Sequence, residues 1–293
     1  MSNTTSERKA FFKKFRGIET QDTEMSFLDH LEVLRWHIVR SAIVLVIIAF
    51  VIFFKIDWVF DNIIYAPARK DFITYTGLCN LGHRLHLGDG LCMPPVDIPL
   101  LGSTVSGPFM SAISISFMGA LIIAFPYLFW ELWRFVKPAL STKELKYARG
   151  SIGWVSLCFF TGAAFGYYLL APFTFNFLAN FQLGTLGVYK YLPTLDDFIE
   201  TLTDIILGCG IAFELPVLAY VLSKLGIITP KFLKVYRKYA YVVILIVAAV
   251  ITPSPDWTSQ TIVAVPLIIL YEISIFISNR VHRQRVKDET QWD

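Results

Sequence analysis

The chain has 293 residues, of which 55% are hydrophobic and 17% are charged, and its formal net charge is +3 at pH 7. The mean hydropathy is +0.56, whereas about a quarter of the residues of an ordinary soluble domain are charged. This composition excludes an ordinary soluble enzyme and predicts an all-α integral membrane protein.

Six apolar runs follow one another along the chain, and each predicts a transmembrane helix, which needs about 20 apolar residues. The runs cover residues 36–54, 109–130, 150–173, 205–222, 239–252 and 261–278. They form a membrane domain over residues 36–278, between an N-terminal segment (1–35) and a basic tail (279–293). Prolines in or near four of the runs predict bent helices; these are Pro126, Pro172, Pro216 and Pro266.

The fifth run is short, because its 14 residues reach only about 21 Å as a helix. A buried or re-entrant segment is therefore an alternative to a span. Thr229 and Pro230 supply an N-cap and a first-turn proline. We therefore expect a helix that begins in water and enters the membrane through residues 236–239.

Most of the 26 Lys and Arg residues lie in the N-terminal segment, in loops 131–149 and 223–239, and in the C-terminal tail. The positive-inside rule places these parts in the cytoplasm. Both termini are thus predicted to be cytoplasmic, in a multi-pass protein of the cell inner membrane. Because topology explains the basic clusters fully, we expect no nucleic-acid partner.

The N-terminal segment is predicted to end in a short interfacial helix. Ser26 and Asp29 resemble a capping box, and Phe27, Leu31 and Leu34 share one helix face. This helix would lie at the cytoplasmic entrance of the first span.

The first predicted outer loop is the longest and contains Cys79 and Cys92. Cysteines that face an oxidising compartment favour a disulfide. Cys79, His83, His86 and Cys92 could instead ligate zinc, although their spacing fits no standard zinc pattern. We predict the disulfide and expect no metal and no cofactor.

Two acids lie within predicted spans. Glu214 is in the middle of the fourth, where an acid costs several kcal/mol unless it is neutral, paired or hydrated. A functional role is our interpretation, and a protonated carboxyl bonded to a neighbouring helix is the alternative. Glu272 lies nearer the cytoplasmic end of the sixth span, where a snorkelling, structural or functional role is possible.

Acids on the basic cytoplasmic surface are candidates for an arginine-bearing ligand, because carboxylate and guanidinium pair in a bidentate fork. Asp29, Glu32 and Glu144 are the candidates. The alternative is that they are exposed charges that only neutralise the basic surface. All five histidines lie at or outside span ends. No base or metal cluster is therefore expected at membrane depth, and we predict that the protein is not an enzyme.

A succession of motifs runs through residues 26–278. They are His30-Leu31-Glu32-Val33-Leu34-Arg35, Ala66-Pro67, Ser106-Gly107-Pro108-Phe109, Trp133 to Leu140, Phe213-Glu214-Leu215-Pro216, Gly226 to Pro230, Arg237-Lys238-Tyr239, and Thr252-Pro253 with Asp256 to Gln260. In this order they resemble the TatC family, the multispanning subunit of the twin-arginine protein translocase.

The resemblance implies a receptor for signal peptides that carry two consecutive arginines. With small single-span partners of the TatA/TatB type, in an oligomeric complex, it would export folded proteins on the proton-motive force. The alternative is a proton-coupled secondary transporter of a small solute that uses Glu214. Such transporters commonly have inverted repeats, and the unequal outer loops argue against that reading.

By position, the resemblance implies that Glu144, Glu32, Phe135 and Arg35 form the signal-peptide site. The family usually reads His-Leu-x-Glu-Leu-Arg, whereas here the glutamate stands one position earlier and Val33 takes its place. The resemblance also implies that Glu214 meets a polar residue of a partner helix. It assigns four further residues to the outer side, namely Pro67, Phe109, Asp256 and Gln260.

Overall fold

The computed structural model describes residues 27–69, 71–84, 86, 92, 98–102, 104–136, 151–181, 192–224, 226, 228–252 and 257–290. They belong to two compact units, residues 1–40 and 41–293. The described part of the first unit is the beginning of α2 (Phe27–Phe53), one continuous α-helix. The predicted interfacial helix is thus not separate from the first span, because no Gly or Pro interrupts residues 27–53.

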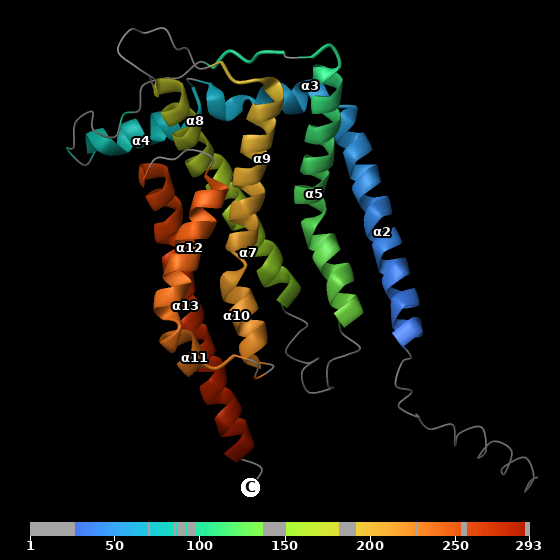
Figure 1. The fold of residues 1–293 in the computed structure, drawn as a ribbon, viewed down its shortest axis with the longest axis vertical. Coiled ribbons are helices and arrows are strands. Elements are labelled where there is room, and N and C mark those ends of the chain that lie inside the picture. Colours follow the sequence, from blue (N-terminus) through green and yellow to red (C-terminus); the bar gives the residue numbers. More distant parts are fainter. Residues whose placement is uncertain are drawn as a thin grey trace, which may run out of the picture. The chain divides into compact units, whose positions relative to one another are not determined.

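The second unit contains the rest of α2 and the other helices, drawn in Figure 1. They are α3 (Ile56–Val59), the π-helical η1 (Phe60–Ile64), the 3-10 turn η2 (Ala66–Ala68), α4 (Ile73–Arg84), α5 (Gly107–Val136), α7 (Ser151–Phe165), the π-helical η5 (Gly166–Leu170), α8 (Ala171–Asn180), α9 (Leu195–Ala212), α10 (Leu215–Lys224), α11 (Pro230–Val235), α12 (Arg237–Ile251) and α13 (Trp257–Thr290).

Within the described residues, five helical stretches are long and apolar enough to cross a membrane. They are Glu32–Phe53, Gly107–Phe135, Ile152–Asn180, Leu195–Lys224 and Gln260–Gln284. Each overlaps a predicted span. The remaining prediction, residues 239–252, coincides with α12, whose 15 residues measure about 22 Å. Thr229 caps α11, as predicted, because its Oγ1 accepts a hydrogen bond from the Phe232 N–H at 3.3 Å. The prediction of one helix that continues through residues 236–239 is wrong, because Tyr236 separates α11 from α12.

The fourth stretch begins earlier than its apolar run. The Thr194 side chain caps α9 by accepting a hydrogen bond from the Asp197 N–H at 3.2 Å. Asp196 and Asp197 in this first turn stabilise the helix, because they lie at the positive end of its dipole. The first turns of α9 are amphipathic, so the continuous apolar run in the sequence begins only at Ile205. Phe198 and Leu202 in these turns are nevertheless buried.

Two of the four prolines follow an interruption of an α-helix. Pro172 follows the π-helical η5, and Pro216 follows the turn at residues 213–214 that separates α9 from α10. Pro126 and Pro266 lie inside α5 and α13. The predicted bends themselves remain a prediction.

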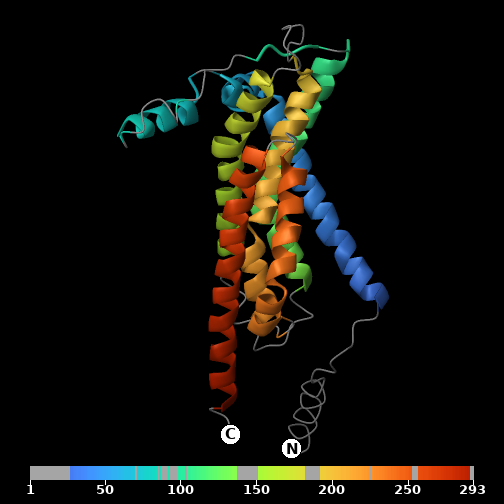
Figure 2. The same ribbon diagram turned by 60° about the vertical axis from the view of Figure 1, so that its left-hand side comes forward.

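Helix α9 is the central helix of the second unit. It packs against α5, α7, η5 and α12, while α10 packs along α13 (Figures 1 and 2). The core gathers around it from helices far apart in the sequence. Its members include Leu170, Phe175, Phe198, Leu202, Ile205, Ala248, Val263 and Leu267.

The second unit has two distinct ends. Ser111 at the start of α5 donates a hydrogen bond to Asp196 at the start of α9, and Leu101 pairs with Thr194 in an isolated bridge. Helices α5 and α9 therefore start at one end, which we call the α4 end. Both run toward the opposite end, the α11 end, where Phe135 and Lys224 lie.

Candidate functional site

The intramembrane acid Glu214 lies in the turn between α9 and α10. Its backbone continues the helical hydrogen bonding, since its N–H donates to Ile211 O at 3.0 Å and its carbonyl accepts from Leu218 N at 2.9 Å. Its carboxyl lies against the backbone of Phe159 in α7. Oxygen Oε1 is buried and has no hydrogen-bond partner among the described residues. A buried carboxyl oxygen of this kind requires a proton or a polar group from elsewhere.

A second acid, Glu131, is buried one turn before Phe135 on α5, with only 1% of its surface exposed. The Tyr127 hydroxyl donates a hydrogen bond to Oε1 at 3.0 Å, and Arg134 Nη1 lies 3.5 Å from the same oxygen. Glu131 is not among the residues that the sequence motifs single out. The available signal was its spacing of four residues from a tyrosine and three from an arginine, which places all three on neighbouring turns.

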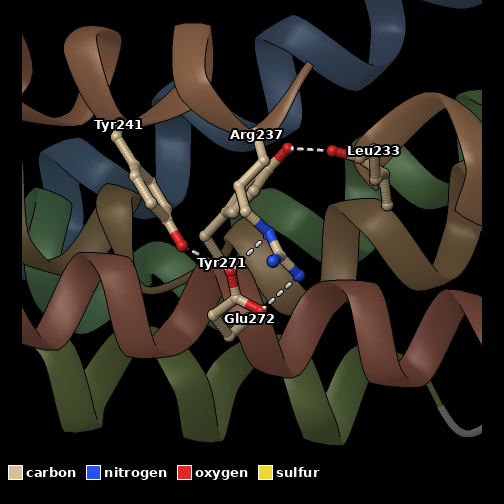
Figure 3. Close-up of polar contacts among 5 residues, drawn as sticks. All are labelled: Leu233, Arg237, Tyr241, Tyr271 and Glu272. Atoms are coloured by element: carbon tan, nitrogen blue, oxygen red, sulfur yellow. Dashed lines mark hydrogen bonds and ion pairs between the residues drawn. The ribbon is translucent and has the colours of Figure 1, made fainter. Parts of the chain in front are cut away.

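The third acid, Glu272 of α13, joins a polar cluster with α12 (Figure 3). Arg237 Nη2 donates to Oε2 at 2.9 Å, and the Tyr241 hydroxyl donates to Oε1 at 2.6 Å. Arg237 Nε also lies 2.9 Å from Oε1 but is not aligned for a hydrogen bond, so that contact is an ion pair only. The Tyr271 hydroxyl donates to Leu233 O at 2.9 Å and ties α11 to α13. Glu272 therefore has a structural role in the α12–α13 hairpin.

Pro67 is buried in η2 and is contacted by Tyr75 of α4. The Tyr75 hydroxyl donates to Pro67 O at 3.1 Å and lies 3.2 Å from Pro172 O. Burial raises the pKa of Tyr75 to about 12, so the hydroxyl remains a donor at any physiological pH. Thr74 adds a hydrogen bond to Tyr168 O. These contacts hold α4 against the π-helical η5.

Phe109 and Gln260, which the resemblance also assigns to the outer side, each contact a neighbouring helix. Phe109 is exposed and meets Phe53 edge to face, with ring centroids 6.3 Å apart. Gln260 donates from Nε2 to Leu245 O at 3.1 Å, which links α13 to α12. Asp256 lies outside the described residues.

The structure joins Cys79 of α4 and Cys92 in a disulfide, with Cα atoms 4.2 Å apart. This is the pairing that the sequence predicts. His83 lies beside it, because its Nε2 is 3.9 Å from Cys92 Sγ. Cys158 and Cys209 are free thiols, and Cys209 is part of the core.

The residues assigned to the signal-peptide site are divided between the two units and the part of the chain outside the described residues. Glu32 and Arg35 are exposed on α2 in the first unit, where the Arg35 guanidinium lies 5.6 Å from the Trp36 ring centroid. Phe135 is half-buried near the end of α5 in the second unit. Glu144 lies outside the described residues. The set therefore remains a prediction.

Comparison with known proteins identifies one family. The family model for the Sec-independent protein translocase protein TatC matches residues 29–266. A TatC from Blattabacterium sp. subsp. Periplaneta americana is 36% identical over 271 residues, which are 92% of this chain and 100% of that protein. A TatC from Helicobacter pylori J99 is 46% identical over 173 residues, or 59% of this chain and 68% of the relative.

A solved structure supports the same family. The crystal structure of a twin arginine translocase receptor, TatC, in DDM superimposes with a TM-score of 0.66 at 30% sequence identity. The match covers 85% of this chain and 99% of that one. These matches confirm the resemblance seen in the sequence motifs: the chain belongs to the TatC family, the membrane-embedded components of the Sec-independent, twin-arginine protein translocase.

Proposed function

We propose that this chain is the signal-peptide receptor and core subunit of a twin-arginine translocase. In this role it exports folded proteins across the cell inner membrane on the proton-motive force. The observation that carries the proposal is the family match over residues 29–266. The crystal structure it resembles is itself described as a translocase receptor, which supports the receptor role over the alternative of a small-solute transporter.

The proposed topology has six spans with both termini in the cytoplasm. Helix α12 would be the fifth span, with tilted neighbours or a thinned bilayer absorbing its short length. The α11 end carries Lys224, Lys231, Lys234 and Arg237, whereas the Cys79–Cys92 disulfide is attached to α4, at the opposite end. The positive-inside rule and the redox preference of disulfides both support a cytoplasmic α11 end.

The proposed signal-peptide site is cytoplasmic, and Phe135 is its described residue in the second unit. Phe135 stands near the end of α5, directly before the segment 137–150 that carries Glu144. Glu32 and Arg35 are exposed on α2 and available to a ligand. Carboxylates that pair with the two arginines in charge-assisted, bidentate hydrogen bonds would give selectivity over lysine.

Crosslinking to a precursor tests the receptor role. The full chain should crosslink to a precursor with a twin-arginine signal peptide and much less to its twin-lysine version. Glu144→Ala should weaken the arginine-dependent crosslink, while Glu200→Ala, which removes an exposed acid from α9 at the α4 end, should leave it unchanged. Equal crosslinking of both precursors would remove the receptor assignment.

Glu214 is the proposed contact for a small single-span partner of the TatA/TatB type. Its Oε1 is buried and has no hydrogen-bond partner among the described residues. A rotation of the side chain toward the exposed face would let it form a hydrogen bond across the helix interface, worth about 1 kcal/mol in a membrane. Ile211 and Leu218 flank it and are 63% and 54% exposed. A partner helix could therefore approach this face without displacing a helix of this chain.

Cysteine crosslinking separates the partner role from proton transport. Cysteines at positions 211 and 218 should crosslink to the partner helix. A cysteine at the exposed Phe276 of α13 is the control and should not crosslink. Glu214→Gln should keep the crosslink because the amide still forms hydrogen bonds, and Glu214→Ala should weaken it. If Gln abolished export as fully as Ala and no partner crosslink formed, a proton-carrying role would replace this one.

A further inference from the structure

We propose that Cys79, His83 and Cys92 form a redox-gated binding site for a thiophilic divalent cation such as Zn²⁺. The disulfide between the two cysteines closes the site, and reduction opens it. The inference does not rest on the proposed topology or on the receptor function.

The ligand atoms are already gathered. The two Sγ atoms and a ring nitrogen of His83 all lie within 4.8 Å of one another, and His83 Nε2 is 3.9 Å from Cys92 Sγ. Tetrahedral zinc, with bonds of about 2.3 Å to sulfur and about 2.0 Å to nitrogen, places such ligands roughly 3.5 to 3.8 Å apart. The contact between Cys92 and His83 therefore needs only a small adjustment.

Helix α4 orients two of the three ligands before any metal arrives. Cys79 and His83 are four residues apart on α4, so their side chains lie on one face of the helix. The same spacing is used by helical zinc sites that present two ligands one turn apart. His83 is exposed and both cysteines are partly exposed, so an ion and a completing water molecule can reach them.

The gating step is an ordinary thiol–disulfide exchange. A dithiol reductant supplies two electrons and two protons, the S–S bond breaks, and the reductant becomes a disulfide. The two thiols of the protein then bind Zn²⁺ as thiolates and release their two protons. The disulfide form offers only His83 among the three, so metal binding and the disulfide exclude each other.

Zinc binding by the full chain in detergent tests the proposal. Cys158→Ser and Cys209→Ser in the background remove the other free thiols, and a phosphine reductant avoids a competing dithiol. The reduced protein should retain about one Zn²⁺ per chain and the oxidised protein none. Zinc should also slow alkylation of both thiols at positions 79 and 92 in the reduced protein.

His83→Ala is the decisive variant, since its side chain is exposed. Losing even an outer-shell partner costs metal sites about 10- to 100-fold in affinity, so loss of this ligand should weaken binding at least about tenfold. Arg84→Ala, at the next position on α4, should change nothing. Zinc bound equally by oxidised protein, or by reduced His83→Ala at unchanged affinity, would overturn the site.

Discussion

The interface between α7 and α9 and the interface between α12 and α13 are built in opposite ways. The first is set by glycines. A Cβ on Gly162 would lie 2.5 Å from Cys209 O, and one on Gly166, the first residue of η5 directly after α7, would lie 2.9 Å from Ile205 O. On the facing helix, a Cβ on Gly210 would lie 2.7 Å from the Phe159 ring. The backbones themselves are therefore in close contact.

The interface between α12 and α13 depends on long side chains. Toward Ile251 it has an apolar part that includes Ala248 and Leu267. Toward the α11 end it is joined by the cluster of Arg237, Tyr241 and Glu272, in which the arginine and glutamate side chains are 43% and 39% exposed. Water can therefore compete for these contacts.

The difference indicates which interface fixes the position of Glu214. The Phe213 Cβ would lie 2.7 Å from a Cβ on Gly162, so the close approach of α7 and α9 includes the turn in which Glu214 stands. A backbone contact of this kind has no spare rotamers with which to adjust. The polar cluster can lose one member and keep the others. Substitutions should therefore have large steric effects at the first interface and graded effects at the second.

Gly162→Ala should have the largest effect. The new Cβ meets a backbone oxygen that cannot rotate away, and overpacking of this kind costs typically 1–3 kcal/mol, so we expect a loss of about 3 kcal/mol in the free energy of unfolding. Thermal unfolding in detergent would measure it. Partner crosslinking near Glu214 should fall in the same variant.

Gly153→Ala is the matched control on the same helix. A Cβ there has nothing within 4 Å, so only the helix propensity changes, and alanine should stabilise by about 0.5–1 kcal/mol. The two substitutions are chemically identical and should have opposite signs. If both were neutral, the close contact of α7 with α9 would not be a determinant of stability.

Local features of this fold could be predicted from the sequence. Thr229 caps its helix because the N-cap preference depends on a few adjacent residues. The pairing of Cys79 with Cys92 follows from the presence of two cysteines in one loop. Apolar runs likewise located the five helical stretches that are long and apolar enough to cross a membrane, because hydropathy is a sum over neighbouring residues.

Features that depend on packing between distant residues could not be predicted. Glu131 stands at the edge of an apolar run, where an acid is ordinarily exposed. It is buried because of the residues that pack against the end of α5, which the local sequence does not reveal. Arg237 and Glu272 are 35 positions apart, and only the α12–α13 hairpin brings them together. The closeness of α7 to α9 likewise arises from glycines on facing helices, which no periodicity within one helix reveals.

Glu272→Ala should have an intermediate effect. It removes the acceptor shared by Arg237 and Tyr241. Hydrogen bonds to charged groups are worth about 1.5–3 kcal/mol when buried, but partial exposure reduces this, so we expect a loss of about 1 kcal/mol. Glu200→Ala, at an exposed acid on α9, should stay within about 0.5 kcal/mol of the parent protein. A Glu272 variant as stable as the Glu200 variant would show that the apolar part alone holds the hairpin.

Tyr241→Phe should have the smallest effect, about 0.5 kcal/mol, because it removes one hydroxyl while Glu272 keeps its ion pair with Arg237. In an Arg237→Met background the hydroxyl is the remaining donor to that carboxylate among the contacts described above, so the same substitution should cost more. The coupling in this double-mutant cycle, from unfolding free energies in detergent, should be about 0.5–1 kcal/mol. Simple additivity would mean that the tyrosine and the arginine act on Glu272 independently, and the polar cluster would then be two separate contacts rather than one graded interface.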